Sequence, residues 1–374
     1  MCIIVSSKIT IKAFLLSHIK VLSETWNISI VVNAGVDIFP ELSGTDIKII
    51  PVGILRDISP INDIAALVKL VTVFSKGNFH LIHSVTPKAG LLAMIAGTLT
   101  HIPYRVHTFT GQVWVTARGI KRQLLKTADK MIALLATHVL TDSISQKNFL
   151  VEQGIVNENE IDVLAKGSIC GVDMDRFKPD TTARSAVRKE QGLSDQNVLF
   201  LFVGRLKKDK GVLDLAKAFS RMSDNCPDAH LLFVGPDEEN LSGKIMQYVL
   251  DKNRIHFVPY TDNPEKFMAA ADVLCLPSYR EGFGNVIIEA AACAVPSIGS
   301  RIYGITDAIQ ENITGKLHTA GNVDEIARLL REFYQSADIR LEMGKQAYLR
   351  AKRDFSKEYV ASALVNFYEN ILQS

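Results

Sequence analysis

The sequence predicts an α/β protein of two doubly wound domains, each a parallel sheet covered by helices. Short β-branched runs alternate with helical patterns from one end of the chain to the other, as in βαβ units. The run VLFLFV at residues 198–203 is apolar at every position, which is typical of a strand whose sheet is covered on both faces. The length of 374 residues fits two domains of ordinary size.

Strands are expected where short runs are rich in Val, Ile, Leu and Phe, and helices where apolar residues recur every three or four positions. In chain order, the expected strands are residues 2–5, 28–32, 80–83, 105–109, 139–142, 198–203, 230–234, 255–258 and 273–276. The expected helices are residues 12–24, 61–75, 88–99, 118–136, 211–222 and 323–334, with one more from about Asn285 through the alanines at 290–292. Because strands and helices alternate, the sheets should be parallel.

A break in this pattern separates the two domains near residues 166–179. The stretch contains Gly167, Gly171 and Pro179 and has neither a helical nor a strand period. A new alternation starts at Val198. Ligands of doubly wound sheets bind beyond the carboxyl ends of the strands, so the expected site is a cleft between the domains.

Composition and charge exclude several classes of protein. With 47% hydrophobic and 22% charged residues, the chain is neither disordered nor collagen-like. The net charge is only +2, which argues against nucleic-acid binding, although residues 1–166 are mildly basic, with 16 Lys or Arg against 12 Asp or Glu. The five cysteines form no zinc spacing, and the phosphate loop G-x-x-x-x-G-K-[ST] of many kinases is absent from the sequence.

The scattered, odd set of cysteines is typical of reduced thiols, so we expect a cytoplasmic protein. The first residues, MCIIVSSKIT, lack the apolar core of a signal peptide followed by a cleavage site. The longest apolar stretch, near residues 89–99, is too short to span a bilayer. Any membrane contact should therefore be peripheral, at the inner face of the plasma membrane.

The first candidate motif is GRLKKDKG, which begins at Gly204 and follows an expected strand. Gly204 lets a ligand approach the backbone, and the N-terminus of the following helix offers free N–H groups and a positive dipole end. Arg205 can bind phosphate oxygens through two parallel hydrogen bonds, and Lys210 adds a point charge. The motif therefore predicts a diphosphate site. The alternative is a solvated basic loop, which is the role we expect for Lys207 and Lys208.

The second candidate motif, EGFGNVIIE, runs from Glu281 to Glu289 and follows another expected strand. Gly282 and Gly284 free the backbone for a tight turn and for close approach of a ligand. Glu281 should lie in the loop, and Glu289 about one turn inside the helix that begins near Asn285. Two carboxylates so placed can accept hydrogen bonds from a ligand rich in hydroxyl groups. The alternative is an acid at the helix start and a surface glutamate.

Together these motifs resemble a known family. The context PSYREGFGNVIIEAAACAVP, with GRLKKDKG upstream, is similar to the retaining glycosyltransferases of family 4, which have the GT-B fold of two facing Rossmann-like domains. The resemblance implies that Arg205 and Lys210 bind the diphosphate of a nucleotide sugar. It also implies that Glu281 contacts the donor sugar and that Glu289 binds the ribose hydroxyls. The full implied donor site is Gly204, Arg205, Lys210, Glu281, Gly282, Phe283, Gly284, Asn285 and Glu289.

The resemblance completes the domain organisation. It implies an acceptor-binding domain over residues 1–166, a nucleotide-sugar domain over residues 167–354, and a last segment, residues 355–374, whose helix crosses back onto the first domain. The front half, HSVTPKAGLLAMIAG followed by RVHTFTGQVW, is similar to a bacterial subgroup that adds sugars to polyprenyl-diphosphate-linked oligosaccharides. In that subgroup the histidine that matches His107 lies beside the donor sugar, at a strand end.

Three residues of the first domain have competing interpretations. A histidine at a strand end, with Gly111 nearby, can bond a sugar hydroxyl or a carbonyl, and the resemblance implies that His107 acts in catalysis. The alternative is a core or loop histidine. His83 is a second candidate. Lys88 opens an expected helix and could meet an acceptor phosphate, with a solvated lysine as the alternative.

The sequence departs from the family at two places. Family members often carry a Gly-Gly loop after the first strand, where this chain has Ser-Ser-Lys at residues 6–8, and the linker has Cys170 in place of the usual Asn. Asp-Met-Asp at residues 173–175 matches the metal-binding D-x-D of another glycosyltransferase fold. Its place in a linker predicts a turn and a helix cap instead. We therefore expect no required metal or other cofactor.

Basic residues recur every fourth position along the expected helix 118–136. They are Arg118, Arg122, Lys126 and Lys130, with Lys121 beside them. Such a stripe can bind anionic lipid headgroups, each charge near the surface contributing about 1 kcal/mol. The competing interpretation is an ordinary amphipathic helix that packs its apolar residues on the sheet. Those residues are Ile120, Leu124, Ala128, Met131 and Leu135.

The sequence thus predicts a retaining, α-forming glycosyltransferase for capsule, O-antigen or a similar surface glycan. The expected donor is a UDP-hexosamine such as UDP-GalNAc or UDP-GlcNAc, and the expected acceptor is a polyprenyl-diphosphate-linked saccharide. One alternative is a UDP-sugar 2-epimerase of similar fold, which needs no acceptor. The other is a non-catalytic subunit that binds a nucleotide sugar. No motif identifies the linkage position or the oligomeric state.

Overall fold

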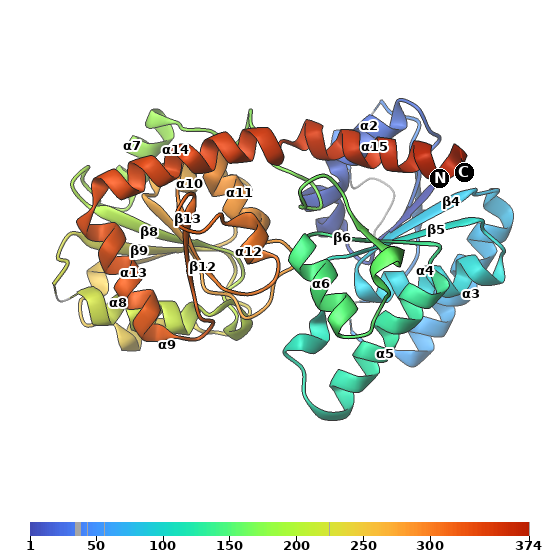
Figure 1. Ribbon diagram of the computed structural model, residues 1–374, viewed down its shortest axis with the longest axis horizontal. Helices are drawn as coiled ribbons and strands as arrows, with labels where there is room; N and C mark the ends of the chain where they lie inside the picture. The colour runs from blue at the N-terminus through green and yellow to red at the C-terminus, as the bar shows by residue number, and fades with distance from the viewer. Residues whose placement is uncertain (34–38, 43, 56, 224, 374) are drawn as a thin grey trace. The chain divides into compact units, whose positions relative to one another are not determined.

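The computed structural model of the chain describes residues 1–33, 39–42, 44–55, 57–223 and 225–373. The chain divides into two compact units (Figure 1). Unit 1 comprises Met1–Cys170 together with Lys357–Ser374, and unit 2 comprises Gly171–Ser356. Each unit is a parallel sheet with helices on both faces, which confirms the predicted architecture of two doubly wound sheets.

Seven parallel strands form the sheet of unit 1, in the order β3-β2-β1-β4-β5-β6-β7. They are β1 (Cys2–Ile4), β2 (Ser29–Val32), β3 (Lys48–Pro51), β4 (Leu81–Val85), β5 (Tyr104–Phe109), β6 (His138–Thr141) and β7 (Ile161–Val163). The direction of strand addition reverses between β1 and β4, which is the defining feature of a doubly wound sheet.

The helices of unit 1 form one layer on each face of the sheet. Helices α3 (Pro60–Gly77), α4 (Pro87–Leu99) and α5 (Gly119–Leu135) lie side by side on one face, and α2 (Leu16–Ser23) and α15 (Lys357–Gln373) pack together on the other (Figure 1). Successive strand residues point to opposite faces of the sheet. Cys2 and Ile4 therefore pack in the core under α3, α4 and α5, and Ile3 packs in the core under α2 and α15. The remaining elements are α1 (Lys8–Thr10), a π-helical turn (Ile11–Leu15), α6 (Ile144–Glu152) and 3-10 turns at Pro40–Leu42, Val113–Val115 and Glu158–Glu160.

Six parallel strands form the sheet of unit 2, in the order β10-β9-β8-β11-β12-β13. They are β8 (Val198–Val203), β9 (Ala229–Val234), β10 (Ile255–Val258), β11 (Val273–Leu276), β12 (Ser297–Ser300) and β13 (Gly315–His318). On one face pack α8 (Val212–Ser223), α9 (Ser242–Tyr248) and α13 (Val323–Gln335); on the other pack α7 (Thr181–Glu190), α10 (Pro264–Ala270), α11 (Asn285–Ala292) and α14 (Ala337–Asp354). Helix α12 (Ile305–Ala308) adjoins α11, and 3-10 turns lie at Lys208–Lys210 and Lys252–Arg254.

All nine expected strands are present, each within two residues of its predicted bounds. The four unpredicted strands are β3, β7, β12 and β13, of which all but β12 lie at sheet edges. The expected first helix is extended at its start and interrupted, because Ser7 caps α1 and the chain then passes through a π-helical turn into α2. Helices α6, α7, α9, α10, α12 and α14 were also not predicted.

Helix α15 belongs to unit 1, where Leu364, Tyr368 and Ile371 are buried in the core shared with α2. The Tyr368 hydroxyl is within hydrogen-bonding distance of His83 Nδ1 on β4. None of the helices in the part of the chain that the structure describes is long and apolar enough to cross a membrane.

Candidate active site

The two candidate motifs meet at the carboxyl edge of the unit 2 sheet. Strands β8 and β11 are neighbours, with Leu201 paired to Leu274, so the loops that follow them leave the sheet side by side. The Tyr279 N–H donates to the Asp209 carbonyl oxygen over 2.8 Å, which ties the two loops together. This edge is where a doubly wound sheet binds its ligand.

Lys210 and Glu281 form an ion pair at this edge. Lys210 Nζ lies 2.6 Å from Glu281 Oε1, and the two side chains are only 16% and 14% exposed. The Ser278 hydroxyl lies 2.8 Å from the same oxygen and donates to it. Such a shielded, charge-assisted pair holds both side chains in one orientation. The fold thus brings together a cation and a carboxylate that came from different motifs of the sequence.

Glycines allow the loops to approach one another. Gly211 has a left-handed φ of +68°, and a Cβ there would lie 2.0 Å from the Pro277 carbonyl oxygen. At the neighbouring strand, a Cβ on Gly235, whose φ is +138°, would lie 2.1 Å from the Gly204 carbonyl oxygen. The basic loop is therefore held between its two neighbours by contacts that only glycine permits.

Arg205 and Lys207 face an acidic loop that the sequence analysis did not identify. Arg205 Nη1 lies 3.3 Å, and Lys207 Nζ 3.6 Å, from Glu238 Oε2 in the loop after β9. The Lys208 N–H donates to Glu239 Oε2 over 3.2 Å. Lys207, which was expected to be a surface lysine, is partly exposed and its ammonium group pairs with this loop, whereas the Lys208 side chain is exposed. These carboxylates are about one-third exposed, so water screens the pairs.

A second set of polar contacts also joins the loops. Arg280 Nη2 lies 3.3 Å from Asp209 Oδ2, and the Tyr279 hydroxyl donates to Asp214 Oδ2 on α8 over 2.7 Å. Burial, and then the neighbouring Asp214, raise the pKa of Tyr279 to about 12, so the phenol keeps its proton. These contacts connect the two loops to each other and to α8.

The start of α11 lies directly after Glu281. Gly284, with φ +76°, is the N-cap, and Asn285 is the first helical residue, as predicted. This geometry places the positive end of the helix dipole at the loop. The Phe283 ring is buried and packs with its centroid 5.2 Å from that of Phe355, so only the Phe283 backbone can meet a ligand.

Glu289 lies on the first turns of α11 and is half-buried. Burial raises its pKa to about 7, and the guanidinium of Arg176 opposes part of this effect. A carboxyl group that titrates near neutrality can both donate and accept hydrogen bonds with hydroxyl groups. That property suits the ribose contact that the resemblance implies.

Comparisons with known families agree with this geometry. Residues 183–350 match the family described as glycosyl transferases group 1, and residues 23–167 match the glycosyl transferase 4-like domain. This chain is a glycosyltransferase. The glycosyltransferase is 28% identical over 320 residues to the capsular polysaccharide biosynthesis glycosyltransferase CapM of Staphylococcus aureus, with 85% of this chain and 84% of CapM covered.

A second relative and a solved structure extend the comparison. The UDP-Gal:alpha-D-GlcNAc-diphosphoundecaprenol alpha-1,3-galactosyltransferase of Escherichia coli is 28% identical over 284 residues, which cover 74% of this chain and 71% of that protein. The structure of Anabaena Alr3699/HepE in complex with UDP and glucose superposes with a TM-score of 0.82 at 17% identity, covering 98% of each chain. The predicted GT-B fold is confirmed.

In unit 1 of the glycosyltransferase, His107 is a core residue of β5. Two strand residues follow it, as in the predicted strand 105–109, and its side chain is 1% exposed, which is the core position given above as the alternative. His107 Nδ1 lies 2.8 Å from the Ser84 hydroxyl oxygen, and the ring packs on Gly90 of α4, where a Cβ would come within 2.4 Å. Burial lowers the pKa of His107 to about 3, so the imidazole is neutral at pH 7.

His83 and Lys88 have partners within unit 1. His83 Nε2 lies 2.7 Å from Thr108 Oγ1, and its Nδ1 faces Tyr368 of α15, so this histidine joins the last helix to the sheet. Lys88 Nζ lies 2.6 Å from Asp63 Oδ1, and the lysine side chain is 17% exposed. Lys88 is thus paired with α3, which differs from both the predicted phosphate contact and the alternative of a solvated lysine.

The sequence departures have local roles. Ser7 Oγ accepts from the Ile9 N–H over 3.2 Å, so the loop after β1 leads directly into a capped helix. Asp173 Oδ1 accepts from the N–H groups of Asp175 and Arg176 over 3.0 and 3.2 Å, which is the predicted turn. Among the residues that the structure describes, no group of three or more His, Cys, Asp or Glu is placed to hold a metal ion.

Helix α5 follows the competing interpretation, an amphipathic helix packed on the sheet, only in part, because Leu135 packs against the core of unit 1 and other residues of the expected apolar side do not. Ile120 is 80% exposed and Leu124 is 64% exposed, whereas the buried residues of α5 are Asp129 and Ile132 on the opposite side. The reason is a polar contact, because Trp114 Nε1 donates to Asp129 Oδ2 over 2.7 Å and draws that side of the helix inward.

Replacing Gly211 with alanine is expected to destabilise the folded protein by about 2–3 kcal/mol, because the positive φ and the Pro277 contact both oppose a Cβ. Urea unfolding measures this change. Gly243→Ala is the matched control, since a Cβ there meets nothing within 4 Å on α9, and it should stabilise by about 0.5–1 kcal/mol. Equal stability of the two variants would contradict the prediction.

Proposed function

We propose that this glycosyltransferase moves a hexosamine, GalNAc or GlcNAc, from its UDP-sugar to a saccharide linked to polyprenyl diphosphate, with retention of the α configuration. The Lys210–Glu281 ion pair at the edge of the unit 2 sheet carries the proposal, with Arg205 in the same loop. The pair places a cation for a diphosphate beside a carboxylate that can accept hydrogen bonds from sugar hydroxyls.

The relatives support a uridine nucleotide as the leaving group. The Escherichia coli relative is named for UDP-Gal, and the Anabaena structure contains UDP and glucose. The resemblance of the front half to transferases of polyprenyl-linked oligosaccharides supports a hexosamine. Galactose is the competing donor sugar, since it is the sugar in the Escherichia coli name.

The same relatives support the acceptor. The name of the Escherichia coli protein specifies GlcNAc-diphosphoundecaprenol, and CapM is named for capsular polysaccharide biosynthesis. We therefore propose a lipid-diphosphate saccharide as the acceptor and a bacterial surface glycan as the product. The acceptor contacts are proposed to come from unit 1.

In the proposed reaction, Arg205 and Lys210 stabilise the negative charge that develops on the departing diphosphate, with the positive end of α11 nearby. This fixed positive charge is why we propose that no metal is required. Glu281, oriented by Lys210 and Ser278, accepts a hydrogen bond from a donor-sugar hydroxyl. Backbone amides of residues 282–284 assist it, and Glu289 holds the ribose.

Retention is proposed to proceed by attack on the same face of the sugar, with the leaving phosphate accepting the proton of the acceptor hydroxyl. No protein nucleophile is assigned. A contact between His107 and the donor sugar is proposed on the resemblance alone, because the His107 ring is buried in the core of unit 1. Because its imidazole is neutral, it would act there as a hydrogen-bonding group and not as a cation.

Replacing Glu238 with glutamine is expected to tighten UDP binding about two- to fivefold at low salt, since Arg205 and Lys207 lose a competing carboxylate. The gain should shrink as salt is added, because these side chains are partly exposed. Isothermal titration with UDP measures it. Glu342→Gln, on the exposed side of α14, is the control and should bind UDP as the unchanged protein does. Unchanged affinity in Glu238→Gln would place the diphosphate elsewhere.

The test of the proposed function is a panel of UDP-sugars, read by thermal shift and by slow donor hydrolysis in the presence of EDTA. A ligand that binds the folded state raises its melting temperature by mass action. We expect stabilisation by one UDP-hexosamine and loss of hydrolysis in Glu281→Ala. Stabilisation by GDP- or ADP-sugars alone would discard the proposed donor, and hydrolysis that stops in EDTA would discard the metal-independent step.

The UDP-sugar panel also tests the two alternatives, a 2-epimerase and a non-catalytic subunit. The relatives reported above are named as glycosyltransferases, so they do not favour a 2-epimerase. Conversion of UDP-GlcNAc to its 2-epimer without an acceptor would reverse that preference. A subunit that only binds would be stabilised by the donor without hydrolysing it.

A further inference from the structure

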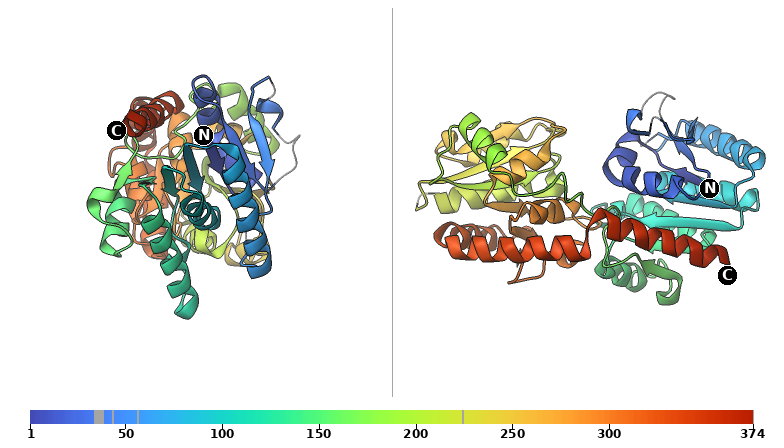
Figure 2. Two further views of the ribbon diagram at one scale, coloured as in Figure 1. Left: turned by 90° about the vertical axis from the view of Figure 1, so that its right-hand side faces the viewer. Right: turned by 90° about the horizontal axis from the view of Figure 1, so that it is seen from above.

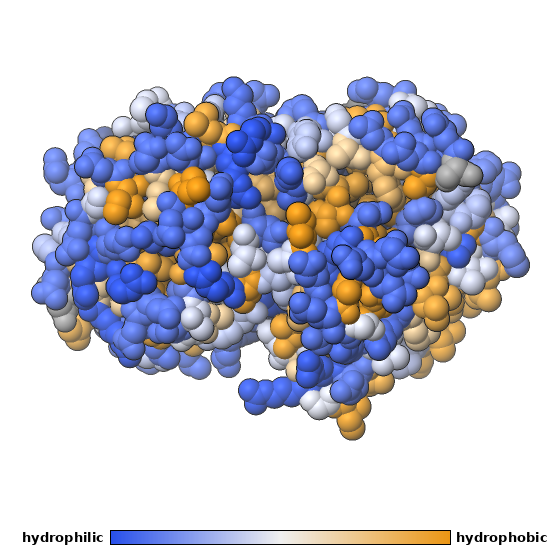
Figure 3. All heavy atoms as spheres, viewed as in Figure 1, coloured by the Kyte–Doolittle hydropathy of each residue, from blue (hydrophilic) through white to orange (hydrophobic). Residues whose placement is uncertain are grey.

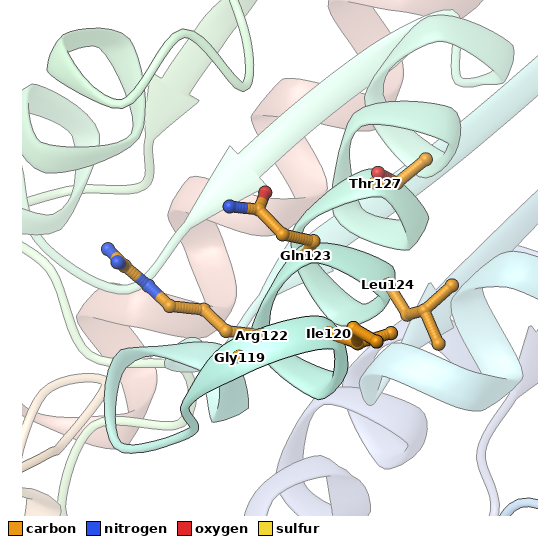
Figure 4. Close-up of a pocket in the computed structure, with 6 residues that line it drawn as sticks. All are labelled: Gly119, Ile120, Arg122, Gln123, Leu124 and Thr127. Carbon is orange, nitrogen blue, oxygen red and sulfur yellow. The ribbon is translucent and has the colours of Figure 1, made fainter.

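An apolar line on α5 is exposed to solvent. It consists of Ile120, Leu124, Met131 and Leu134, which are 80%, 64%, 42% and 82% exposed. Their spacing of 4, 7 and 3 residues aligns them along one side of the helix. Figure 4 shows the side chains of Ile120 and Leu124 projecting from α5 away from that of Arg122. Exposed apolar side chains gathered on one side of a helix are typical of a contact with a partner or a membrane.

Lysines flank the apolar line on both sides. At about 100° per residue, Lys121 lies on one side of the line and Lys130 on the other. Both lysines are exposed. Asp129, the one acidic residue in the sequence of α5, is buried on the opposite side and bonded to Trp114. The exposed charge along α5 is therefore entirely positive.

The other basic side chains of α5 fix its orientation on unit 1. Arg122 and Lys126 lie over the Trp114 ring, 5.9 and 5.3 Å from its centroid. Lys126 Nζ also donates to Gln153 Oε1 over 3.0 Å, and Trp114 itself stacks on Phe149 at 5.4 Å. The outward direction of the apolar line is thus built into the packing of the helix.

We propose that α5 docks the enzyme on an anionic lipid bilayer, with the apolar line at the acyl-chain boundary and the two flanking lysines on anionic headgroups. Amphipathic helices with basic flanks lie in the plane of the membrane interface in this way. Helix α5 extends away from the sheet of unit 1 in perpendicular views (Figures 1 and 2), and hydrophobic atoms reach the surface at its end in Figure 3. The inference goes beyond the proposed reaction, because it concerns where the enzyme binds and not which sugar it transfers.

Charge favours a bilayer over a second copy of this chain. Two copies paired through the same face would bring Lys121 and Lys130 of one copy toward those of the other, and like charges repel. An anionic bilayer instead presents negative charge across the whole plane of contact. It also offers an apolar layer directly beneath that charge.

The test is co-sedimentation of the full chain with vesicles of phosphatidylglycerol and phosphatidylcholine, compared with phosphatidylcholine alone. We expect binding at least about tenfold tighter to the anionic vesicles, weakened by added salt. Ile120→Glu combined with Leu134→Glu should reduce binding at least about tenfold, because two inserted side chains become charged. Leu341→Glu on α14, where the leucine is 71% exposed, is the matched control and should bind as the unchanged protein does.

Insertion has a separate measurement. The Trp emission of Leu124→Trp should shift to shorter wavelength on anionic vesicles and stay unchanged without them. Equal vesicle binding by the double variant, or no emission shift, would overturn the proposal. A dimer that becomes a monomer in the double variant, seen by size exclusion, would assign the face to a second copy and also overturn it. Donor stabilisation should persist in every variant, so its absence would concern the proposed reaction instead.

Discussion

Replacing Lys210 with alanine is expected to lower turnover about 10²- to 10³-fold and to weaken UDP binding by about 1–3 kcal/mol. The substitution removes a cation proposed to act on the diphosphate. It also leaves Glu281, whose Oε1 lies 2.6 Å from Lys210 Nζ, without its charged partner. Initial rates at saturating donor, together with calorimetric UDP binding, separate the loss in the chemical step from the loss in affinity.

Lys208→Ala is the matched control for this experiment. Lys208 lies in the same loop, its side chain is exposed, and only its backbone N–H bonds to the acidic loop. The control should therefore keep both turnover and affinity close to those of the unchanged enzyme. An equal loss in the two variants would indicate a general effect of charge in the loop, and normal turnover in Lys210→Ala would remove Lys210 from the site.

Replacing Asp129 with asparagine is expected to stabilise the folded protein at pH 8 by up to about 4 kcal/mol, and to change its stability little near pH 4. Asp129 is 4% exposed, and burial raises its pKa from 3.8 to about 7, against the effect of the Trp114 hydrogen bond. Between these two pKa values, the Asp129 carboxyl group keeps its proton in the folded chain and has lost it in the unfolded chain. Stability therefore falls as the pH rises through this range. Asparagine keeps an acceptor for Trp114 and has no proton to lose.

Urea unfolding from pH 4 to pH 8 measures this difference. Other buried carboxyl groups, such as Glu289 with its pKa of about 7, change stability in the same direction, so the comparison is between variants and not within one pH profile. Asp195→Asn, at an exposed aspartate in a turn, should leave the profile unchanged. Parallel profiles for Asp129→Asn and the unchanged protein would contradict the prediction.

Strands with unbroken apolar runs were predictable because a strand of a sheet covered on both faces buries all of its side chains. In Val198–Val203, the first five residues are buried. Strands β12 (SIGS) and β13 (GKLH) have no such run, and close packing explains their residues instead. A Cβ on Gly315 would lie 2.1 Å from the Ser297 carbonyl oxygen, so glycine is needed by the approach of two strands and not by strand propensity.

The donor motifs were predictable one at a time, because glycine and charged residues after a strand point to a ligand. Their pairing was not predictable. Lys210 and Glu281 are 71 residues apart and meet because β8 and β11 are neighbours in the sheet. Glu238 belongs to no spacing pattern, and its position after β9 was the one signal that could have identified it.

Periodicity predicted that α5 is a helix with one apolar side, and the structure has that helix at Gly119–Leu135. Periodicity did not predict which side faces inward. A buried carboxyl group decides this, since Asp129 binds Trp114 and Ile132 packs beside it. Periodicity assigns apolar residues to the core, so it cannot predict a helix side that packs through a polar residue such as Asp129.

The return of α15 to unit 1 sets an order for folding during synthesis. Unit 2 is encoded by one continuous stretch, Gly171–Ser356, so all of its parts are present once that stretch has been made. Unit 1 needs two separate pieces of the chain, and His83 meets Tyr368 across 285 residues of sequence. The first unit to begin is therefore the last to finish, and its α2 face stays uncovered while the whole of unit 2 is being synthesised.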